Sequence, residues 1–396
     1  MSAKLRLPVL AARVAVNVAR ERVAPVRLAS LHDVPPSASA LSNEWLTAAL
    51  CRAVPGASVV GFQVVGGSDG TSSRRALRVS YNAAGHEAGL PVALFMKTAS
   101  SLQSRLMLVL GGVTECETIF YRDIRPELTR LRSPRTYHAA SDPRTFRSIV
   151  LMEDLGAQGW SFPDPMHEGI ERRDAEDMID QMAYYHAAFW NDPRLGTVLA
   201  RLPSTERFQQ QLNEIGIDKR ARVGIERGRS AMPAAVYRRR DELLPATMHA
   251  LRLNSRAVPT VLHQDVHQGN WLRDPDGRMG LYDWQCVAKG EWALDVSYAL
   301  SVNVAVEDRR AWERELLQRY LWRLGEEGVG RPPSFDEAWL RYRQQPFHVL
   351  IFALFTIGAG RLQPDMQPKD YMLRCLERIT TFIDDHDSLD SLTGSG

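Results

Sequence analysis

The chain has 396 residues, 24 % of them charged, and a formal net charge of +2. This length allows two or three domains, or one large bilobal domain, and the near-neutral balance without a dense basic face gives no indication of a nucleic-acid partner. Four cysteines, far apart and without a CxxC pair, argue against a zinc site or a disulfide framework and favour a reducing cytoplasm.

Residues 1–40 are predicted to form a basic N-terminal arm. Its first 30 positions carry one acid, Glu21, and several basic residues between Leu and Val, namely Lys4, Arg6, Arg13, Arg20, Arg22 and Arg27. Because Arg13 interrupts the apolar stretch, we do not expect the arm to be a signal peptide. It either packs on the protein or is loosely ordered, or else it forms an amphipathic helix on a membrane surface. No apolar run approaches the roughly 20 residues that span a bilayer.

The next segment, residues 41–152, is predicted to be a β-rich lobe. A helix is expected from Ser42, as N-cap, to about Ala53, where Pro55-Gly56 ends it. Strand patterns follow in "SVVGFQVVGG", "ALRVSYN", "PVALFMK", "RTYHAA" and "RSIVLME", with the turn-rich "AAGHEAGL" between the second and third. The segment "GVTECETIFYRDI" has apolar residues at helical spacing and predicts a helix between the third and fourth strands.

After "EDLG" the pattern becomes helical, and we assign residues 153–386 to a second lobe. Residues 170–255 are predicted to be mostly helical, with breaks near positions 191–193 and 228. Residues 295–384 are also helical in pattern, interrupted at "GVGRPPS" and "GAGRLQP". Between them, a loop leads to the strand "WL", the turn "DPDG" and the strand "MGLY". The fold class is therefore α+β, and the acidic end of the chain, residues 387–396, is expected to be a flexible tail.

The stretch "VLHQDVHQGNWLRDPDGRMGLYDWQ" concentrates acids and amides between strand-like runs. Asp265 and Asn270 share one loop, and Asp283 returns after the second hairpin strand, so all three can face one place. Phosphoryl transfer from ATP needs a carboxylate near the acceptor hydroxyl and oxygen ligands for Mg²⁺, which these residues provide.

Phosphoryl transfer also requires a lysine that contacts the phosphates and a carboxylate that holds this lysine in place. Lys97 ends the apolar strand "VALFMK", in a chain with only five lysines (Lys4, Lys97, Lys219, Lys289 and Lys369). Glu117 on the next helix can pair with it, and Glu115 is the alternative partner. The segment "GGSDGTSSR" between two strands can bring backbone N–H groups near phosphates.

These motifs resemble those of the aminoglycoside phosphotransferase and choline kinase superfamily. "HQDVHQGN" and "YDWQ" are similar to its HxDxxxxN and D-[FW]-x motifs, and "ETIFY" and "VLMEDLG" to its E-x-x-x-Y helix and its hinge. "WALDVSYAL" resembles the helix that follows the metal aspartate of the superfamily. "YHAAFWND" and the Gln after Asp283-Trp284 favour the ecdysteroid-kinase-like (CHK kinase-like) branch. The resemblance covers roughly residues 60–300. It implies a bilobal protein-kinase-like fold with a β-rich N-lobe and a mainly helical C-lobe that carries a catalytic-loop hairpin.

The resemblance also implies a role for each matching residue. Asp265 would be the catalytic carboxylate, and Asn270 and Asp283 would be Mg²⁺ ligands. Lys97 would contact the α- and β-phosphates of ATP and pair with Glu117. The residues expected to contact the rest of the nucleotide are Ser68, Asp69, Gly70, Thr71 and Ser72 over the phosphates, and Glu153, Asp154 and Leu155 at the adenine. The phosphate loop departs from the family pattern because it lacks a full GxGxxG.

Other polar residues in these motifs are interpreted as structural. His263 is expected to orient the loop through hydrogen bonds, and Asp295 to support the loop from behind. His186 is expected to lie in the core, because it stands in the apolar helix pattern "YYHAAFW".

The expected activity is ATP- and Mg²⁺-dependent phosphorylation of a hydroxyl group of a small molecule. Residues 300–362 show no surplus of acids for a polycationic acceptor, whereas "FHVLIFALFTIG" is strongly apolar. We therefore expect a moderately apolar alcohol of the steroid or terpenoid type. An aminoglycoside or choline-type kinase, GTP as donor, and a non-catalytic nucleotide-binding module are the alternatives. A protein kinase is disfavoured because no segment ending in an APE-like element follows Asp283.

Overall fold

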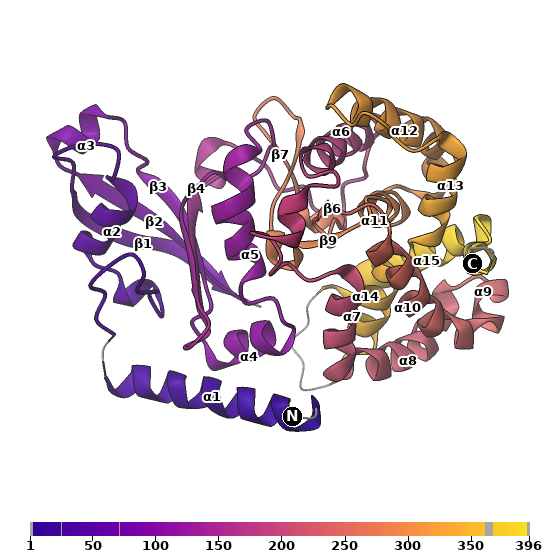
Figure 1. Cartoon of the computed structure of the whole chain (residues 1–396), viewed down its shortest axis with the longest axis horizontal. Helices are drawn as coiled ribbons and strands as arrows, with labels where there is room; N and C mark the ends of the chain where they lie inside the picture. The colour runs from indigo at the N-terminus through magenta and orange to yellow at the C-terminus, as the bar shows by residue number, and fades with distance from the viewer. Residues whose placement is uncertain (1–2, 25, 71, 361–366, 394–396) are drawn as a thin grey trace. The chain divides into compact units, whose positions relative to one another are not determined.

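The computed structural model describes residues 3–24, 26–70, 72–360 and 367–393. The chain divides into two compact units, Met1–Trp160 and Ser161–Gly396. The first contains an antiparallel sheet and the second is mainly helical (Figure 1), so the predicted α+β class is confirmed. Among the residues that the structure describes, no helix combines the length and the apolar character that a membrane crossing requires.

A five-stranded antiparallel sheet, in the order β1-β2-β3-β5-β4, is the framework of the first unit. Its strands are β1 (Val59–Asp69), β2 (Ser73–Tyr81), β3 (Ala93–Thr98), β4 (Thr136–Asp142) and β5 (Arg147–Glu153). All five coincide with the strand patterns of the sequence, because one face of the sheet is buried and selects apolar residues there.

The helices of the first unit agree less closely with the sequence pattern. They are α1 (Ala3–Val23), α2 (Asn43–Leu50), α3 (Ala83–Glu87), α4 (Leu102–Leu110) and α5 (Cys116–Ile119), with the π-helical turn η2 (Phe120–Ile124) and the 3-10 turns η1 (Ala38–Ala40), η3 (Arg125–Glu127) and η4 (Gly156–Gln158). Helix α3 lies where turns were predicted, and α4 was not predicted. The helix expected from residue 112 begins only at Cys116, because Gly112 has the left-handed φ of 72°.

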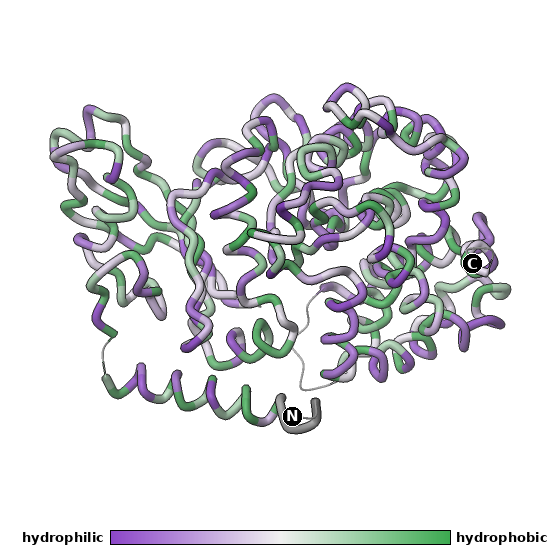
Figure 2. The backbone as a smooth tube through the Cα atoms, in the orientation of Figure 1, coloured by the Kyte–Doolittle hydropathy of each residue, from purple (hydrophilic) through white to green (hydrophobic). Residues whose placement is uncertain are grey.

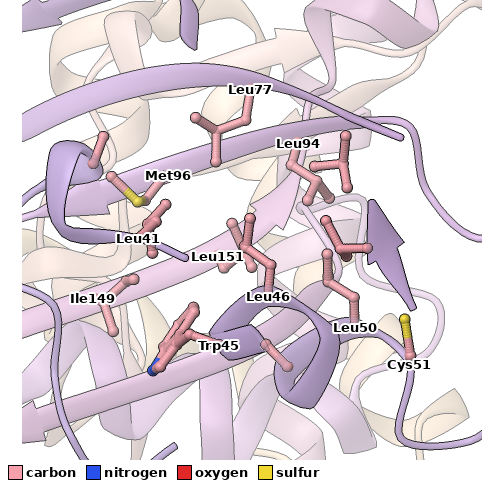
Figure 3. Close-up of a cluster of buried hydrophobic side chains, with 14 of the residues drawn as sticks. Leu41, Trp45, Leu46, Leu50, Cys51, Leu77, Leu94, Met96, Ile149 and Leu151 are labelled. Atoms are coloured by element: carbon pink, nitrogen blue, oxygen red, sulfur yellow. The ribbon is translucent and has the colours of Figure 1, made fainter. Parts of the chain in front are cut away.

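The core of this unit lies between helix α2 and the sheet. Ser42 caps α2, since its Oγ accepts a hydrogen bond from the N–H of Trp45 at 3.2 Å. Figure 3 shows the buried side chains, which include Leu41, Trp45, Leu46 and Leu50 from α2 and its approach, and Leu77, Leu94, Met96, Ile149 and Leu151 from β2, β3 and β5. Strand β3, which ends with Lys97 and Thr98, is therefore held from one face by this core.

The N-terminal arm forms helix α1, which packs beside α4 in the first unit (Figure 1). Hydrophilic and hydrophobic residues alternate along it (Figure 2), and Val14 and Val18 are buried. Glu21 accepts hydrogen bonds from Arg105 at 2.6 Å and Arg147 at 2.8 Å. Burial raises the pKa of Glu21, but these two guanidinium groups outweigh it and hold the pKa below its ordinary value. The arm is thus attached to the first unit by apolar contacts and by ion pairs.

The second unit contains the remaining helices and two small antiparallel strand pairs. Its helices are α6 (Arg172–Ala188), α7 (Thr205–Glu214), α8 (Ile217–Arg227), α9 (Ala234–Arg238), α10 (Arg240–Arg256), α11 (Ala293–Asn303), α12 (Val306–Glu326), α13 (Phe335–Gln344), α14 (Phe347–Ile357), α15 (Lys369–Asp385) and α16 (Ser388–Ser391). Strand β6 (Thr260–Leu262) pairs with β9 (Ala288–Gly290), and β7 (Trp271–Arg273) with β8 (Met279–Leu281). The first pair was not predicted, because its two short strands are far apart in the sequence and no turn like the "DPDG" between β7 and β8 joins them. Helix α16 lies in the segment expected to be a flexible tail, and Leu389 and Leu392 there are buried.

Helices α8 and α14 cross in direct backbone contact at two glycines. A Cβ on Gly224 would lie 1.9 Å from the carbonyl oxygen of Leu354, and a Cβ on Gly358 would lie 2.0 Å from that of Arg220. These neighbours are backbone atoms, which cannot rotate away as a flexible side chain can. Only glycine at these two positions therefore allows α8 and α14 to pack this closely, and the close packing fixes α14 against α8.

We expect Gly224→Ala to lower the free energy of unfolding by about 2 kcal/mol, because the added methyl group forces the two helices apart. Chemical denaturation followed by circular dichroism measures the change. The matched control is Gly325→Ala on α12, where the added Cβ would approach no closer than 3.8 Å to Pro332. This control should retain or slightly increase stability, since alanine favours helix. Equal stability of the Gly224 variant and the native protein would contradict the prediction.

Candidate functional site

The polar stretch of the sequence forms a loop between β6 and β7 and a return after β8. Two non-glycine residues here have left-handed backbone conformations, Gln264 with φ of 65° and Asp283 with φ of 63°. Such conformations are uncommon outside glycine and persist where surrounding contacts hold them. The contacts of this loop therefore decide the orientation of its side chains.

Asp295, in the first turn of α11, holds the loop from within the core. Its carboxylate accepts hydrogen bonds from the backbone N–H groups of His263 at 2.7 Å and Gln264 at 2.9 Å. It also accepts from the hydroxyl of Tyr185 at 2.7 Å, and Nε2 of His186 lies 3.4 Å away. Burial raises the pKa of Asp295, but the donors, His186 first, outweigh it and hold the pKa below its ordinary value. The predictions of a supporting Asp295 and a core His186 are confirmed.

His263 connects the loop to the residue that precedes Asp283. Its Nδ1 accepts from the N–H of Asp265 at 3.2 Å, and its Nε2 donates to the carbonyl oxygen of Tyr282 at 2.9 Å. Burial lowers the pKa of His263, so the ring is a neutral imidazole with its proton on Nε2. His263 orients the loop by hydrogen bonds, as the sequence predicted.

The Asp265 carboxylate is held by three neighbours. Asn270 Nδ2 donates to the Asp265 carbonyl oxygen at 2.7 Å and to its Oδ2 at 3.3 Å. The hydroxyl of Tyr298 donates to Oδ1 at 3.0 Å, and His267 Nε2 lies 3.8 Å from Oδ2. The contact of Tyr298 with Asp265 was not predicted from the sequence. Tyr298 stands three residues after Asp295, however, and therefore lies on the same face of α11.

Asp283 stands at the start of the 3-10 turn η8 (Trp284–Cys286), after β8. It is tied to Asn270 through its neighbour Tyr282, whose N–H donates to the Asn270 carbonyl oxygen at 3.0 Å. The buried Trp284 anchors the turn, with its ring 4.5 Å from that of His263 and 5.1 Å from that of Tyr185.

The atoms at Asn270 and Asp283 fit a hard divalent cation. The Asn270 amide nitrogen faces Asp265, so Oδ1 is the atom that can ligate a cation, and Asp283 adds a carboxylate. Among the described residues, no three His, Cys, Asp or Glu side chains form a metal-binding group of their own. Mg²⁺ commonly uses one or two protein oxygens and completes its shell with phosphate oxygens and water, so this donor set suits it.

The first unit contains a buried ion pair at the end of β3. Lys97 Nζ lies 2.5 Å from Glu117 Oε1 on α5, and their side chains are only 7 % and 12 % exposed. The sequence left Glu115 as an alternative partner, and it directly precedes α5. In the structure Lys97 forms this ion pair with Glu117, which is the partner that the resemblance implied.

The predicted phosphate loop forms the tip of the β1–β2 hairpin, where Ser68, Asp69, Gly70 and Ser72 are described and Thr71 lies outside the described residues. Gly70 N donates to Ser72 O at 3.0 Å. Arg75 Nη1 donates to the Ser68 carbonyl oxygen and its Nη2 to the Asp69 carboxylate, both at 3.1 Å. The hydrogen bond from Arg75 lowers the pKa of Asp69, which keeps this exposed carboxylate ionised.

The predicted hinge follows the last strand of the first unit. Glu153 ends β5, and its Oε2 accepts from the N–H of Arg135 at 2.9 Å. Asp154 pairs with Arg78 at 3.2 Å, and Leu155 is buried. The structure thus places Lys97, Glu117, the hairpin and the hinge in the first unit. In the second unit it brings Asn270 into contact with Asp265, and Asp283 directly follows Tyr282, whose backbone N–H donates to Asn270.

With this geometry established, residues 114–334 match the family described as "Phosphotransferase enzyme family". The matched span is more than half of the 396-residue chain and includes the whole loop from β6 to η8. The chain belongs to this phosphotransferase family.

The fold of this phosphotransferase is similar to several solved structures. An ethanolamine kinase of Plasmodium vivax has 12 % sequence identity, with 82 % of this chain and 83 % of that chain covered and a TM-score of 0.47. A choline kinase of Streptococcus pneumoniae has 12 % identity, with coverage of 83 % and 94 % and a TM-score of 0.44. A macrolide 2'-phosphotransferase of Brachybacterium faecium has 12 % identity, with coverage of 79 % and 96 % and a TM-score of 0.39. No curated protein matched the chain.

Two further residues of the phosphotransferase hold the loop without having been singled out in the sequence. Asn303, at the end of α11, donates to the Val266 carbonyl oxygen at 2.8 Å. His348 on α14 donates from Nε2 to the Gln264 carbonyl oxygen at 3.0 Å. Burial lowers the pKa of His348 to about 4, so the ring is neutral. His348 stands in the run "FHVLIFALFTIG", where no local signal separates it from other core residues.

Proposed function

We propose that the chain transfers the γ-phosphoryl group of ATP to a hydroxyl group of a small molecule, with Mg²⁺ bound at Asn270 and Asp283. The observation that carries the proposal is the Asp265 carboxylate, which Asn270 and Tyr298 hold in the loop of a phosphotransferase-family chain. A non-catalytic nucleotide-binding module of the same fold would not need a carboxylate fixed in this way.

In the proposed reaction, the acceptor hydroxyl oxygen attacks the γ-phosphorus of ATP. The new P–O bond forms as the bond to the bridging oxygen of ADP breaks, and the hydroxyl proton passes to Asp265. Mg²⁺, when bound, supplies positive charge against the phosphate oxygens. Asn270 and Asp283 would hold it, and the contact between Asn270 and Asp265 keeps the catalytic carboxylate beside this donor set.

The first unit supplies the nucleotide contacts in this proposal. Lys97 contacts the α- and β-phosphates, and Glu117 keeps its ammonium group in place. Backbone N–H groups of residues 68–72 cover the phosphates, and backbone atoms of residues 153–155 bind adenine. At the hinge, the Leu155 carbonyl oxygen accepts hydrogen bonds from Gln158 N at 3.0 Å and Trp160 N at 3.1 Å. The backbone N–H of Leu155 is therefore the group proposed to contact adenine.

For the acceptor, we propose a moderately apolar alcohol, steroid- or terpenoid-like, as in the ecdysteroid-kinase-like branch. Helix α14 supports this choice, because Phe352, Phe355 and Ile357 are only half-buried on a helix that also contacts the loop through His348. Apolar surface that the fold leaves partly uncovered can bind an apolar substrate. The cytoplasm, where ATP is available and thiols stay reduced, is the proposed compartment.

A labelling experiment tests the function and identifies the acceptor. A metabolite extract is incubated with γ-labelled ATP and either the native protein or Asp265→Ala, and the labelled products are separated. The expected result is an alkyl phosphate that forms only with the native protein. A parallel ATP-consumption screen compares apolar alcohols with aminoglycosides and choline, and GTP replaces ATP in one arm. Preference for the cationic acceptors would contradict the proposed substrate class, and the absence of any labelled product would contradict the function.

The buried ion pair gives a separate prediction. Lys97→Met should lower kcat/KM for ATP by about 10²-fold, because one charge-assisted contact to the phosphates is lost. Glu117→Gln should lower it as well and also reduce stability, since Lys97 would then be buried with a weaker partner. Steady-state kinetics at varied ATP and thermal denaturation measure both effects. The control is Lys219→Met at an exposed position of α8, which should leave both unchanged. Native kinetics in the Lys97 variant would exclude its proposed role.

A further inference from the structure

Helix α11 contacts four successive residues of the catalytic loop through three polar side chains. Asp295 accepts from the N–H groups of His263 and Gln264, Tyr298 donates to the side chain of Asp265, and Asn303 donates to the carbonyl oxygen of Val266. Three of these contacts go to backbone atoms and hold the course of the chain. The Tyr298 contact is different, because it goes to the side chain proposed to receive the proton.

The Tyr298 hydroxyl is a permanent donor in a rigid place. Tyr298 is 3 % exposed, and its ring lies 6.2 Å from that of His348. Burial, followed by the negative charge of Asp265, raises the pKa of the phenol well above its ordinary value, so the hydroxyl stays protonated. A buried ring packed on one helix cannot move to follow the carboxylate, so the carboxylate must adopt the orientation that the hydroxyl sets.

We propose that Tyr298 is a positioning residue for phosphoryl transfer, which holds Oδ1 of Asp265 so that Oδ2 faces the acceptor hydroxyl. The proposal rests on the proposed function. The terminal torsion of an aspartate is broad, so a carboxylate without this donor can rotate away from the acceptor. The remaining neighbours, Asn270 at 3.3 Å and His267 at 3.8 Å, both lie at Oδ2, so Oδ1 would lose its only described donor. Misplacement of a reacting group by about 1 Å can cost about 10²-fold in rate.

The first test is Tyr298→Phe, which removes the hydroxyl and keeps the ring. We expect kcat to fall by about 10- to 100-fold, while KM for ATP and for the acceptor stay within about twofold. The matched control is Tyr342→Phe on α13, whose buried hydroxyl donates to the Glu313 carboxylate at 3.1 Å. Both variants lose the same type of hydrogen bond, but only the first should lose activity. A role in folding alone would instead lower the thermal stability of both variants and leave kcat of the folded protein unchanged.

The second test is a double-mutant cycle with Asp265→Asn. If Tyr298 acts through the carboxylate, Tyr298→Phe should change kcat by less than about twofold in the Asp265→Asn background. Independent effects that multiply would overturn the positioning role. A Tyr298→Phe protein with native kcat would also overturn it and leave the proposed function standing. A native protein that phosphorylates no acceptor would overturn both, so the two failures are distinguishable.

Discussion

Replacing Asp265 by asparagine is expected to lower kcat by about 10²- to 10⁴-fold, the range that a positioned general base contributes. Asparagine has nearly the same shape, and the hydrogen bond from Asn270 to the backbone carbonyl oxygen of residue 265 should persist. The amide keeps only one acceptor oxygen, however, and it cannot take up the proton of the acceptor hydroxyl. Binding of Mg-ATP, measured by calorimetry, should therefore change by less than about threefold.

The control for this prediction is Asp276→Asn, at an exposed turn position of the hairpin that joins β7 and β8. It removes the same charge a short distance along the chain, and it should retain native kcat. Turnover of the Asp265 variant at the rate of this control would remove Asp265 from the mechanism. If the Asp265 variant lost both turnover and Mg-ATP binding, Asp265 would instead have a role in nucleotide binding.

Asp295→Ala is expected to reduce the free energy of unfolding by about 3–5 kcal/mol. The carboxylate is fully buried and accepts from two backbone N–H groups, from Tyr185 and from His186. Alanine leaves these donors buried without an acceptor. Denaturant titration measures the loss, and Asp336→Ala, which removes an exposed acid from α13, should cost less than about 1 kcal/mol.

The contribution of Asp295 should also depend on pH. Its folded-state pKa lies below the ordinary value of 3.8, so the stabilisation is complete above that value and is lost as the pH falls through the folded-state pKa. The difference in stability between the native protein and Asp295→Ala should therefore be constant near neutral pH and narrow only in acid. A difference that narrowed between pH 6 and pH 8 would show that another group is responsible.

Much of this protein could be predicted because the relevant signals are local. A strand with one buried face repeats every two residues, so the five strands of the sheet are visible in the sequence. Asp265 and Asn270 stand five residues apart in one loop, and their contact follows from that spacing. The polar stretch that follows β6 concentrates acids and amides because it forms the loop between β6 and β7 and the segment after β8, which together carry the candidate site.

Other features became visible only through packing. Helix α4 was missed because its buried residues depend on the surfaces that cover it. The pair β6–β9 was missed because no turn joins its two strands, whereas "DPDG" marks the equally short pair β7–β8. His348 reaches Gln264 across 84 residues of chain, and Tyr298 reaches Asp265 across 33. The identity of neither residue predicts its contact with the loop, since buried aromatic residues in apolar helices are common.

The sequence by itself determined the fold class, the family resemblance and the side chains proposed for the chemistry, because these depend on short-range patterns and on residue type. Only the tertiary structure decided how Asp265 is held. That orientation depends on helix α11, which begins 28 residues later, and on a buried hydroxyl at 3.0 Å. Contacts of this kind arise when distant segments are brought together by burial of apolar surface, and the sequence near either partner carries no record of the other.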